Sequence, residues 1–369
     1  MVKVLTFLGT RPELIKLAPL IPLLYQHCDH RLVHSGQHYS YELDARFFAE
    51  LELPAPDYTL NVGSASHGEQ TARMLSRLEP ILQAEAPAVV IVQGDTNTAL
   101  AGALCAAKLQ IAVVHVEAGC RSFNRAMPEE QNRIVIDHLA SLLCAPDEVA
   151  VSHLLAEGIP AKRIALVGST AIDACERARP FAARSRILNR LEVEPGHYLA
   201  LTLHRAENTT PAILPGILAA LATLAEAQPI VFPAHPRTLA ALTAQNLTLP
   251  PGIKLCPPLG YLDTLRLVGA ARALLTDSGG LQEEAAVLGT PALILREETE
   301  WHTLVACGFH TLVGNRCETI LATAVEALRP ARLDALHANP PAMRGGASKR
   351  ICTLVEALRF DPPAVAAAP

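Results

Sequence analysis

Three acidic residues in the first half of the chain have surroundings that suit proton transfer. Asp95 follows the apolar run 89–92, Glu117 follows a second apolar run, and Glu129 lies where a helix is expected to begin. Carboxylates that share a cleft away from water raise one another's pKa, so one can hold a proton while another accepts one. Ordinary helix starts explain the same residues, with Asp95 as a cap and Glu129 paired with Arg133 four residues on.

A second group of residues has the chemistry to bind an anion. Ser278-Gly279-Gly280 separates the apolar run 273–276 from a helical stretch, and Glu284 follows about one turn later. The two glycines let backbone N–H groups approach an anion, and the start of a helix adds partial positive charge. No Gly-Lys-Ser/Thr follows, so this is not a P-loop. The turn is predicted to bind a diphosphate and Glu284 to accept from a ribose diol, although a plain tight turn would also explain the pattern.

Basic side chains come directly after other apolar runs. Arg11 opens a helix after the first run, with Lys16 about one turn along it, and His204, Arg205 and His235 follow two runs in the second half. The end of a strand beside a helix start is a common place for an anionic group. A capped helix with solvated charges at Arg11, and a structural histidine at His204 and His235, would explain the same residues.

Short apolar runs that alternate with longer amphipathic stretches must position these residues. The predicted strands are 4–8, 31–34, 89–93 and 111–116 in the first half, then 164–167, 199–203, 230–233, 273–276 and 292–295. Helical stretches such as 99–108 and 133–143 lie between them. This alternation predicts parallel sheets with right-handed crossovers. The carboxyl ends of such strands gather at one edge, where open α/β sheets bind ligands.

The alternation starts again between residues 165 and 200, and the polar, Ala- and Arg-rich helical stretch 171–194, which ends at Pro195-Gly196, lies in between. We therefore expect an α/β protein with two Rossmann-like, doubly wound domains and the ligand in a cleft between them. Domain one, 1–168, would carry the carboxylates, and domain two, 169–348, the diphosphate turn. The Pro- and Ala-rich end of the last segment, 349–369, is expected to be frayed.

Composition argues against several classes of protein and site. The net charge is −5, Lys and Arg are dispersed and aromatic residues are few, so no nucleic-acid surface is expected. The nine cysteines include no C-x-x-C pair, which indicates reduced thiols and no metal site. No apolar run approaches the ~18 residues of a membrane helix, and the N-terminus does not read as a signal peptide. A cytoplasmic protein is the expectation.

Together these motifs resemble the non-hydrolysing UDP-N-acetylglucosamine 2-epimerase family. The resemblance extends from Gly9 to about Gly314, with Gly-Thr-Arg-Pro-Glu, Gly-Asp-Thr, His-Val-Glu-Ala-Gly, Pro-Glu-Glu, His-Arg and Thr-Asp-Ser-Gly-Gly-x-Gln-Glu-Glu in the family's order. It implies the GT-B architecture, in which two Rossmann-like domains close on the ligand. It also implies that a last helix, here about 349–358, returns to the first domain, and that the protein is a homodimer.

The family's reaction inverts C2 of the sugar in UDP-N-acetylglucosamine. UDP is eliminated to give a 2-acetamidoglucal and is added back after C2 is protonated on the other face, which yields UDP-N-acetylmannosamine for surface polysaccharide synthesis. No cofactor is needed, and the chain has no G-x-G-x-x-G fingerprint. By this resemblance, the diphosphate is held by Arg11, His204, Ser278, Gly279 and Gly280.

The resemblance also assigns other positions. Asp95, Glu117 and Glu129 match the acid–base carboxylates, Lys16 the active-site lysine and Glu284 the ribose contact. Some family members bind a second UDP-N-acetylglucosamine as an activator, and the positions near such a site are Gln37, His38, Gln70, Arg205 and His235.

Departures from the common pattern leave the exact UDP-sugar open. The segments 121–127, 204–208, 235–238 and 300–301 look more like the subgroup that acts on UDP-2,3-diacetamido-2,3-dideoxyglucuronate. Hydrolysing relatives carry Gly-Asp-Arg, so Thr96 argues against free sugar as the product. A GT-B glycosyltransferase and a non-catalytic nucleotide-sugar sensor are rival interpretations of the same motifs.

Overall fold

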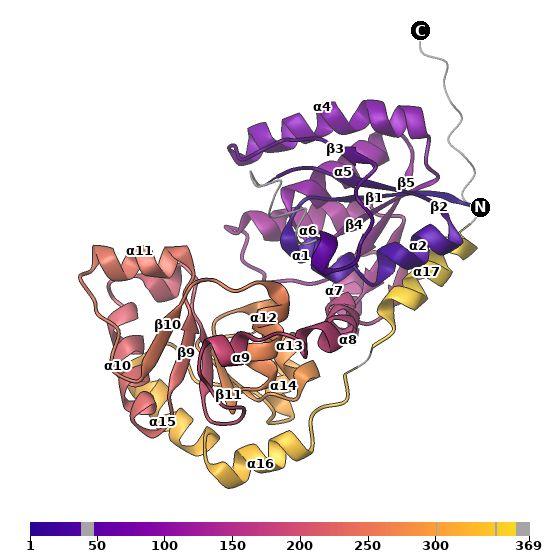
Figure 1. Cartoon of the computed structure of the whole chain (residues 1–369). Helices are drawn as coiled ribbons and strands as arrows, with labels where there is room; N and C mark the ends of the chain where they lie inside the picture. Colours follow the sequence, from indigo (N-terminus) through magenta and orange to yellow (C-terminus); the bar gives the residue numbers. More distant parts are fainter. Residues whose placement is uncertain (38–47, 300, 344, 359–369) are drawn as a thin grey trace. The chain divides into compact units, whose positions relative to one another are not determined.

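A computed structural model describes residues 1–37, 48–299, 301–343 and 345–358. The chain divides into two units, each built around its own sheet (Figure 1). The first unit contains Met1–Ala174 together with the C-terminal residues 345–358, and the second contains Cys175–Met343. The division falls inside helix α8 (Thr170–Ala182), in the polar stretch between the two repeats of the strand–helix pattern.

The first unit has a seven-stranded sheet in the order β3-β2-β1-β4-β5-β6-β7, and each pairing in it is parallel. The strands are β1 (Lys3–Leu8), β2 (Asp29–His34), β3 (Tyr58–Thr59), β4 (Val89–Gln93), β5 (Ala112–Val116), β6 (Leu142–Ala145) and β7 (Ile164–Leu166). Every residue of β4 is buried, as a strand covered on both faces must be. The strand order reverses between β1 and β4, so the switch point of the sheet lies there.

The helices of the first unit are α1 (Arg11–Leu17), α2 (Leu20–His27), α4 (His67–Glu85), α5 (Asn97–Lys108), α6 (Pro128–Leu139), α7 (Glu148–Ala156) and α17 (Ala347–Ala357). Helix α5 lies very close to the sheet at Gly102. A Cβ at this position would be only 2.8 Å from both Phe7 and Val92. The last helix, α17, packs against α2 (Figure 1). Asp173 fixes its start by accepting the backbone N–H groups of Gly346 and Ser348.

The second unit has a six-stranded parallel sheet in the order β10-β9-β8-β11-β12-β13. Its strands are β8 (Leu199–Thr202), β9 (Ile230–Pro233), β10 (Ile253–Cys256), β11 (Ala273–Thr276), β12 (Ala292–Ile294) and β13 (Thr311–Leu312). Its helices are α9 (Ile187–Arg190), α10 (Leu214–Ala227), α11 (Pro236–Ala244), α12 (Tyr261–Gly269), α13 (Gly279–Leu288), α14 (His302–Ala306), α15 (Cys317–Ala327) and α16 (Pro330–Ala338). The switch point lies between β8 and β11.

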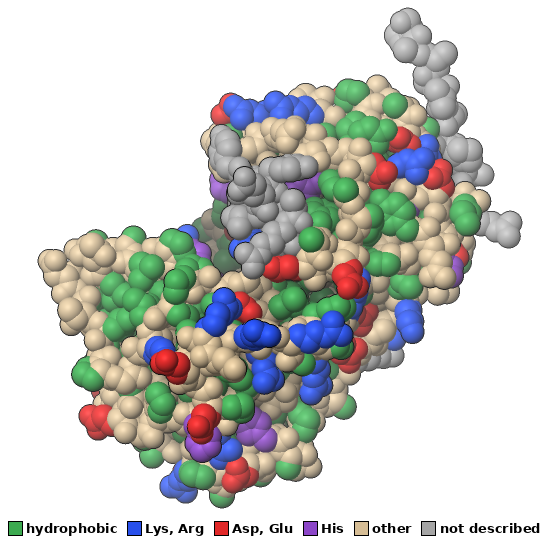
Figure 2. All heavy atoms as spheres, viewed as in Figure 1, with side chains coloured by type: hydrophobic (Ala, Val, Ile, Leu, Met, Phe, Trp, Pro, Cys, Tyr) green, Lys and Arg blue, Asp and Glu red, His purple; other side chains and the backbone are tan. Residues whose placement is uncertain are grey.

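Within the described ranges, no helix is both long and apolar enough to cross a bilayer. On the face drawn in Figure 2, several Lys and Arg side chains lie near one another, with acidic side chains among and around them. The charge on this face is therefore mixed, and an anionic ligand would be held by local groups.

Candidate active site

Three loops at the carboxyl ends of β1, β4 and β5 carry the predicted groups of the first unit. The β4–α5 loop contains Gly94 at φ 69°, and the β5–α6 loop contains Glu117 at φ 70° and Gly119 at φ 82°. Left-handed backbone is unfavourable by about 1–2 kcal/mol for a residue with a Cβ, and it clusters at functional sites. Glu117 therefore needs side-chain contacts that hold it in place.

Lys16 and Gln93 provide those contacts. The ammonium of Lys16 lies 2.8 and 2.6 Å from the two carboxylate oxygens of Glu117, and the Gln93 amide donates to one of them at 2.8 Å. The ion pair joins α1 to the end of β5 across 101 positions of sequence. The structure thus brings together two of the predicted residues, Lys16 and Glu117.

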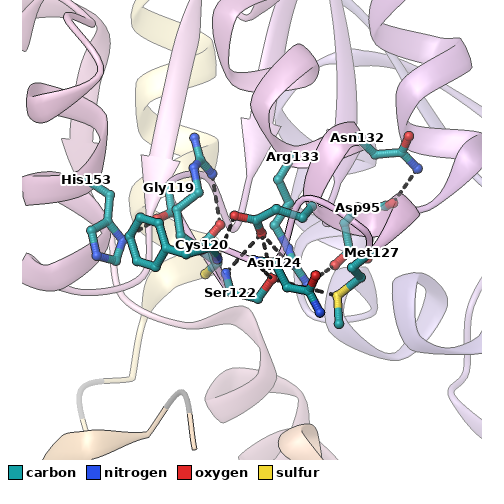
Figure 3. Close-up of polar contacts among 12 residues, drawn as sticks. Asp95, Gly119, Cys120, Ser122, Asn124, Met127, Asn132, Arg133 and His153 are labelled. Carbon is teal, nitrogen blue, oxygen red and sulfur yellow. Dashed lines mark hydrogen bonds and ion pairs between the residues drawn. The ribbon is translucent and has the colours of Figure 1, made fainter. Parts of the chain in front are cut away.

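Asp95 is held by Asn132 and Arg133 of α6 (Figure 3). The Arg133 guanidinium donates to its carboxylate at 2.5 Å, and the Asn132 amide donates to its backbone carbonyl at 2.8 Å. Burial raises the pKa of Asp95, and the nearby Glu117 raises it further. Arg133 and Lys16 lower this pKa, but the net result is a raised value. Asp95 and Glu117 are therefore coupled carboxylates at neighbouring strand ends, which suits proton exchange.

Glu129 does not join this group through any contact of the described residues. It is exposed at the second position of α6, whereas Glu130 is buried and accepts the backbone N–H groups of Ser122 and Phe123 at 2.9 Å each. Arg133 pairs with Glu130 at 2.8 Å and with Asp95, so the expected pairing of Glu129 with Arg133 is wrong. The geometry of the loop that precedes α6 decides this, because it presents backbone donors to Glu130.

Glu13 is a buried carboxyl group of the site to which sequence reasoning gave no role. It accepts the N–H groups of Gly9 and Thr10 at 2.9 and 2.7 Å and the Thr96 hydroxyl at 2.6 Å, which ties the β1–α1 loop to the residue after Asp95. The pattern Thr10-x-x-Glu13 is a capping box and could have indicated this arrangement. Burial, although opposed by these hydrogen bonds, raises the pKa of Glu13 from 4.5 to about 7.

Glu13→Gln is expected to remove a pH dependence of stability. A carboxyl whose pKa is raised on folding contributes stability below its unfolded pKa, 4.5, and loses it as pH rises through about 7. The substituted amide does not ionise: its oxygen can accept the N–H groups of Gly9 and Thr10, and its NH₂ can donate to the Thr96 hydroxyl. Relative to wild type, the variant should therefore gain on the order of 3 kcal/mol in free energy of unfolding between about pH 5 and about pH 8. Denaturant unfolding at both values measures this, with the exposed Glu69→Gln as control; an equal gain in both variants would contradict it.

Four of the remaining predicted residues of the first unit are placed as follows. Arg11 is exposed at the first position of α1. The Thr98 hydroxyl donates to Gln37 at 2.7 Å, and the Asn97 amide donates to Gln70 at 2.9 Å, so both glutamines contact the first turn of α5. His38 lies outside the described residues.

A buried aspartate organises the matching edge of the second unit. Asp277 follows β11 and accepts the backbone N–H groups of His204 and Arg205, each at 2.9 Å, and Nδ1 of His204 lies 2.9 Å from its other oxygen. Burial would raise the pKa of Asp277, but the His204 side chain and these N–H groups lower it below its usual value. Nδ1 of His204 therefore donates to Asp277, which leaves Nε2 for a ligand.

Two candidates of the proposed activator site flank this histidine. The Arg205 guanidinium donates to the Asp277 carbonyl at 2.9 Å, and the rings of His204 and His235 are 5.8 Å apart. His235 also caps α11, where it accepts the N–H of Arg237 at 3.1 Å. The described activator candidates thus fall into two sets, Gln37 with Gln70 in the first unit and Arg205 with His235 in the second.

The Ser278-Gly279-Gly280 turn opens α13, as the sequence predicts. The Ser278 hydroxyl accepts the N–H of Leu281 at 3.4 Å, and the indole of Trp301 donates to the Gly279 carbonyl at 2.8 Å. A Cβ on Gly280 would meet nothing within 4 Å. Glu284 lies half-buried farther along the same helix. The first N–H groups of a helix have no partner within the helix, so this turn can bind a phosphate.

Gly280→Ala is expected to weaken nucleotide binding without harming the fold. The methyl group fits the open space at the helix start and should stabilise α13 by up to about 1 kcal/mol, but it stands where a diphosphate would approach. The Kd for UDP should rise by about tenfold or more, which corresponds to about 1.4 kcal/mol. Fluorescence of Trp301, the only tryptophan of the chain, measures it because its indole contacts Gly279. Gly216→Ala in α10 is the matched control; equal UDP affinity in both variants would contradict the assignment.

Comparison with known proteins gives a family. A family model described as UDP-N-acetylglucosamine 2-epimerase matches residues 24–356. The chain is 45% identical over 333 residues to a UDP-N-acetylglucosamine 2-epimerase of Methanocaldococcus jannaschii, with 86% of this chain and 90% of that protein covered. It is 40% identical over 328 residues to a UDP-2,3-diacetamido-2,3-dideoxy-D-glucuronate 2-epimerase of Pseudomonas aeruginosa, covering 87% and 91%.

Comparison with solved structures gives the same family. The M. jannaschii enzyme in complex with UDP-GlcNAc and UDP is similar at a TM-score of 0.85 and 42% identity, covering 96% of this chain and 99% of that one. The glycosyltransferase of kitacinnamycin shares the fold at a TM-score of 0.59 and 14% identity, covering 96% and 98%. The predicted fold class, two Rossmann-like parallel-sheet domains of GT-B type, is confirmed. The chain therefore belongs to the UDP-N-acetylglucosamine 2-epimerase family.

Proposed function

We propose that this protein is a non-hydrolysing epimerase that interconverts UDP-N-acetylglucosamine and UDP-N-acetylmannosamine. The observation that carries the proposal is the placement of Asp95 and Glu117 at adjacent strand ends, where Glu117 raises the pKa of Asp95 and Lys16 pairs with Glu117. Coupled carboxylates suit the removal and return of a proton at C2. The names of the relatives support the substrate, and the diphosphate turn of the second unit supports a nucleotide sugar.

The first step is elimination of UDP. The C2 hydrogen has no neighbouring carbonyl to acidify it, so a base removes it while the bond from C1 to the diphosphate oxygen breaks. The products are UDP and a 2-acetamidoglucal. Negative charge grows on the leaving diphosphate, and N–H groups of Ser278-Gly279-Gly280, with His204 and Arg11, stabilise that charge. Asp277 holds His204 through Nδ1, and in this scheme Nε2 donates to the diphosphate.

The second step returns UDP to C1 while a carboxylic acid protonates C2 on the opposite face. Each turnover begins and ends with one proton on the protein, so the two steps balance without an oxidant or reductant. Asp95 and Glu117 supply the acid and the base, and Glu129 is the third candidate. Lys16 and Gln93 keep Glu117 oriented. Glu284 contacts the ribose in this scheme.

The family resemblance supports the wider setting. We propose in addition that the protein lies in the cytoplasm, as a homodimer that supplies a precursor for surface polysaccharide. A second nucleotide sugar would contact Gln37, His38, Gln70, Arg205 and His235.

UDP-2,3-diacetamido-2,3-dideoxyglucuronate is a second candidate substrate. The 40% identity to the P. aeruginosa enzyme, and the segments 204–208 and 235–238, favour it. The chemistry at C2 is the same, and only groups that contact the added acetamido and carboxylate of the sugar would differ.

Incubation with each UDP-sugar, without an acceptor, tests the proposal. Proton NMR of the anomeric signals should show UDP-N-acetylmannosamine formed from UDP-N-acetylglucosamine until equilibrium. If only the diacetamido-uronate gives product, the proposed reaction would stand and this sugar would be the substrate in place of UDP-N-acetylglucosamine. Tight binding of both sugars with no change in either would overturn the epimerase proposal in favour of a sensor, and transfer of the sugar to an added acceptor would favour a glycosyltransferase.

A further inference from the structure

A buried ion network in the first unit takes no direct part in the reaction proposed above. His115 in β5 and Asp137 in α6 are fully buried, and Nδ1 of His115 lies 2.6 Å from Oδ1 of Asp137. Arg121 lies 2.7 Å from Oδ2 of Asp137 and also 2.7 Å from Glu157 of the segment that follows α7. These four side chains thus form one continuous network, which is buried except at Glu157.

This network contacts both loops that carry the candidate carboxylates. Nε2 of His115 lies 2.8 Å from the backbone carbonyl of Gly94, the residue before Asp95. The carboxylate of Asp137 accepts the N–H of Gly119, two residues after Glu117, at 3.1 Å. The His115–Asp137 pair therefore bonds to the peptide group that precedes Asp95 and to the N–H of the second residue after Glu117.

The donors and acceptors of the network can be assigned from these contacts. A carbonyl only accepts, so Nε2 of His115 carries a hydrogen and donates to Gly94. Burial would raise the pKa of Asp137, but His115 and Arg121 lower it below its usual value. Asp137 is then an ionised acceptor, and Nδ1 of His115 donates to it as well. The ring bridges the two acceptors with both of its N–H groups.

The loops need such a bridge because of their backbone. Glu117 has positive φ, and for a residue with a Cβ this conformation persists only where surrounding contacts determine it. Gly119 has no room for a side chain, since a Cβ would lie 2.4 Å from the carbonyl of Ala150. Its own carbonyl lies 3.0 Å from Nδ1 of His153, a contact drawn in Figure 3. Losing the bridge would leave both loops free to shift.

We propose that His115 and Asp137 are positioning residues for epimerisation: together they set the spacing of Asp95 and Glu117 about the C2 atom. The role rests on the proposed function. A reacting group displaced by about 1 Å can lower a rate by about 10²-fold. Substrate affinity depends mainly on the diphosphate turn of the second unit, so it should be spared.

Three variants and a matched control test this role. His115→Asn keeps an N–H near the Nδ1 position and loses the bond to Gly94, His115→Gln keeps an N–H near the Nε2 position, and Asp137→Asn removes the shared charge. The control is His30→Asn. His30 is also a buried histidine of the same sheet, with Nε2 2.8 Å from the Thr6 hydroxyl, but it contacts neither loop.

The expected result is a split between kcat and KM. His115→Asn and Asp137→Asn should lower kcat by about 10- to 100-fold with KM and the Kd for UDP within about twofold of wild type. His115→Gln should recover part of the loss because it restores the link to Gly94. His30→Asn should lower Tm and leave kcat unchanged. If a variant does not fold, Arg121→Lys, which keeps a cation beside Asp137, should show the same split in weaker form.

Wild-type kcat in folded His115→Asn, or in folded Arg121→Lys, would overturn the positioning role alone. So would a loss of kcat in the His30→Asn control as large as that in His115→Asn. A wild-type protein that epimerises neither UDP-sugar would overturn the proposed function itself, and the positioning role with it.

Discussion

Asp95→Asn is expected to lower turnover of UDP-N-acetylglucosamine by ~10²-fold or more while UDP binds with nearly unchanged affinity. Asparagine has the same shape and can still accept from Arg133, so the loop should keep its form. It cannot take up or release a proton, and the coupled pair with Glu117 is lost. Steady-state kinetics gives the loss of kcat, and the fluorescence of Trp301 gives the affinity for UDP.

Losses of similar size are expected for Glu117→Gln and Glu129→Gln. The second is the more informative, because Glu129 is exposed and contacts neither Asp95 nor Glu117 through any bond of the described residues. Glu148→Gln is the matched control, an exposed acid in the first turn of α7. Wild-type rates in all three variants would contradict the acid–base assignment. If only Glu129→Gln has a wild-type rate, the acid and the base are Asp95 and Glu117.

Asp277→Asn is expected to have the second large effect, on stability and turnover together. Its fully buried carboxylate accepts from four groups: the backbone N–H groups of His204 and Arg205, the His204 ring and the Asn208 amide. In Asp277→Asn, an NH₂ group would replace one of the two oxygens and would face N–H donors there. Breaking such a buried network should lower the free energy of unfolding of the second unit by about 2–4 kcal/mol. Because His204 loses its partner, kcat should fall by about 10²-fold.

The pH dependence of this variant follows from the sign of the shift. The pKa of Asp277 is lowered on folding, so its contribution is complete above the ordinary value of 3.8 and is lost as pH falls through the lower folded value. The stability gap between wild type and Asp277→Asn should be constant near neutral pH and close in acid. Denaturant unfolding measures the gap. Asp263→Asn, which loses the partly exposed pair with Arg190, is the control and should cost under about 1 kcal/mol. Equal losses in the two variants would contradict the role of Asp277.

The central strands could be predicted from sequence because a strand buried on both faces is a continuous apolar run. Residues 89–92 of β4 are of this kind, and the buried parts of β1 and β5 depart from it only at Thr6 and His115. β3 and β13 have two residues each, and β10 contains Lys254 at the edge of its sheet, so none of them gives such a signal. The helix expected at 133–143 is wrong at its end, because α6 stops at Leu139 and β6 begins at Leu142. Only Ala140, whose backbone is extended, and Ser141 separate the two elements.

Placement of the site at the strand ends could also be predicted, since parallel strands bring their carboxyl ends to one edge. The partners of each side chain could not. Glu129 and Glu130 are neighbours in sequence, and only the loop before α6 decides which of them is buried. Glu13 with Thr96, and His115 with Asp137, are pairs separated by 83 and 22 positions. A local sequence pattern cannot predict contacts between residues so far apart in the chain.

Solvent exchange at C2 tests the central claim most directly. The protein is incubated with UDP-N-acetylglucosamine in deuterated water, and both product and recovered substrate are analysed by NMR. Carboxylates that remove and return the C2 proton predict deuterium at C2 of UDP-N-acetylmannosamine and, with time, at C2 of the substrate. Product that keeps its original C2 hydrogen would contradict the mechanism, because inversion would then proceed without the acid–base pair.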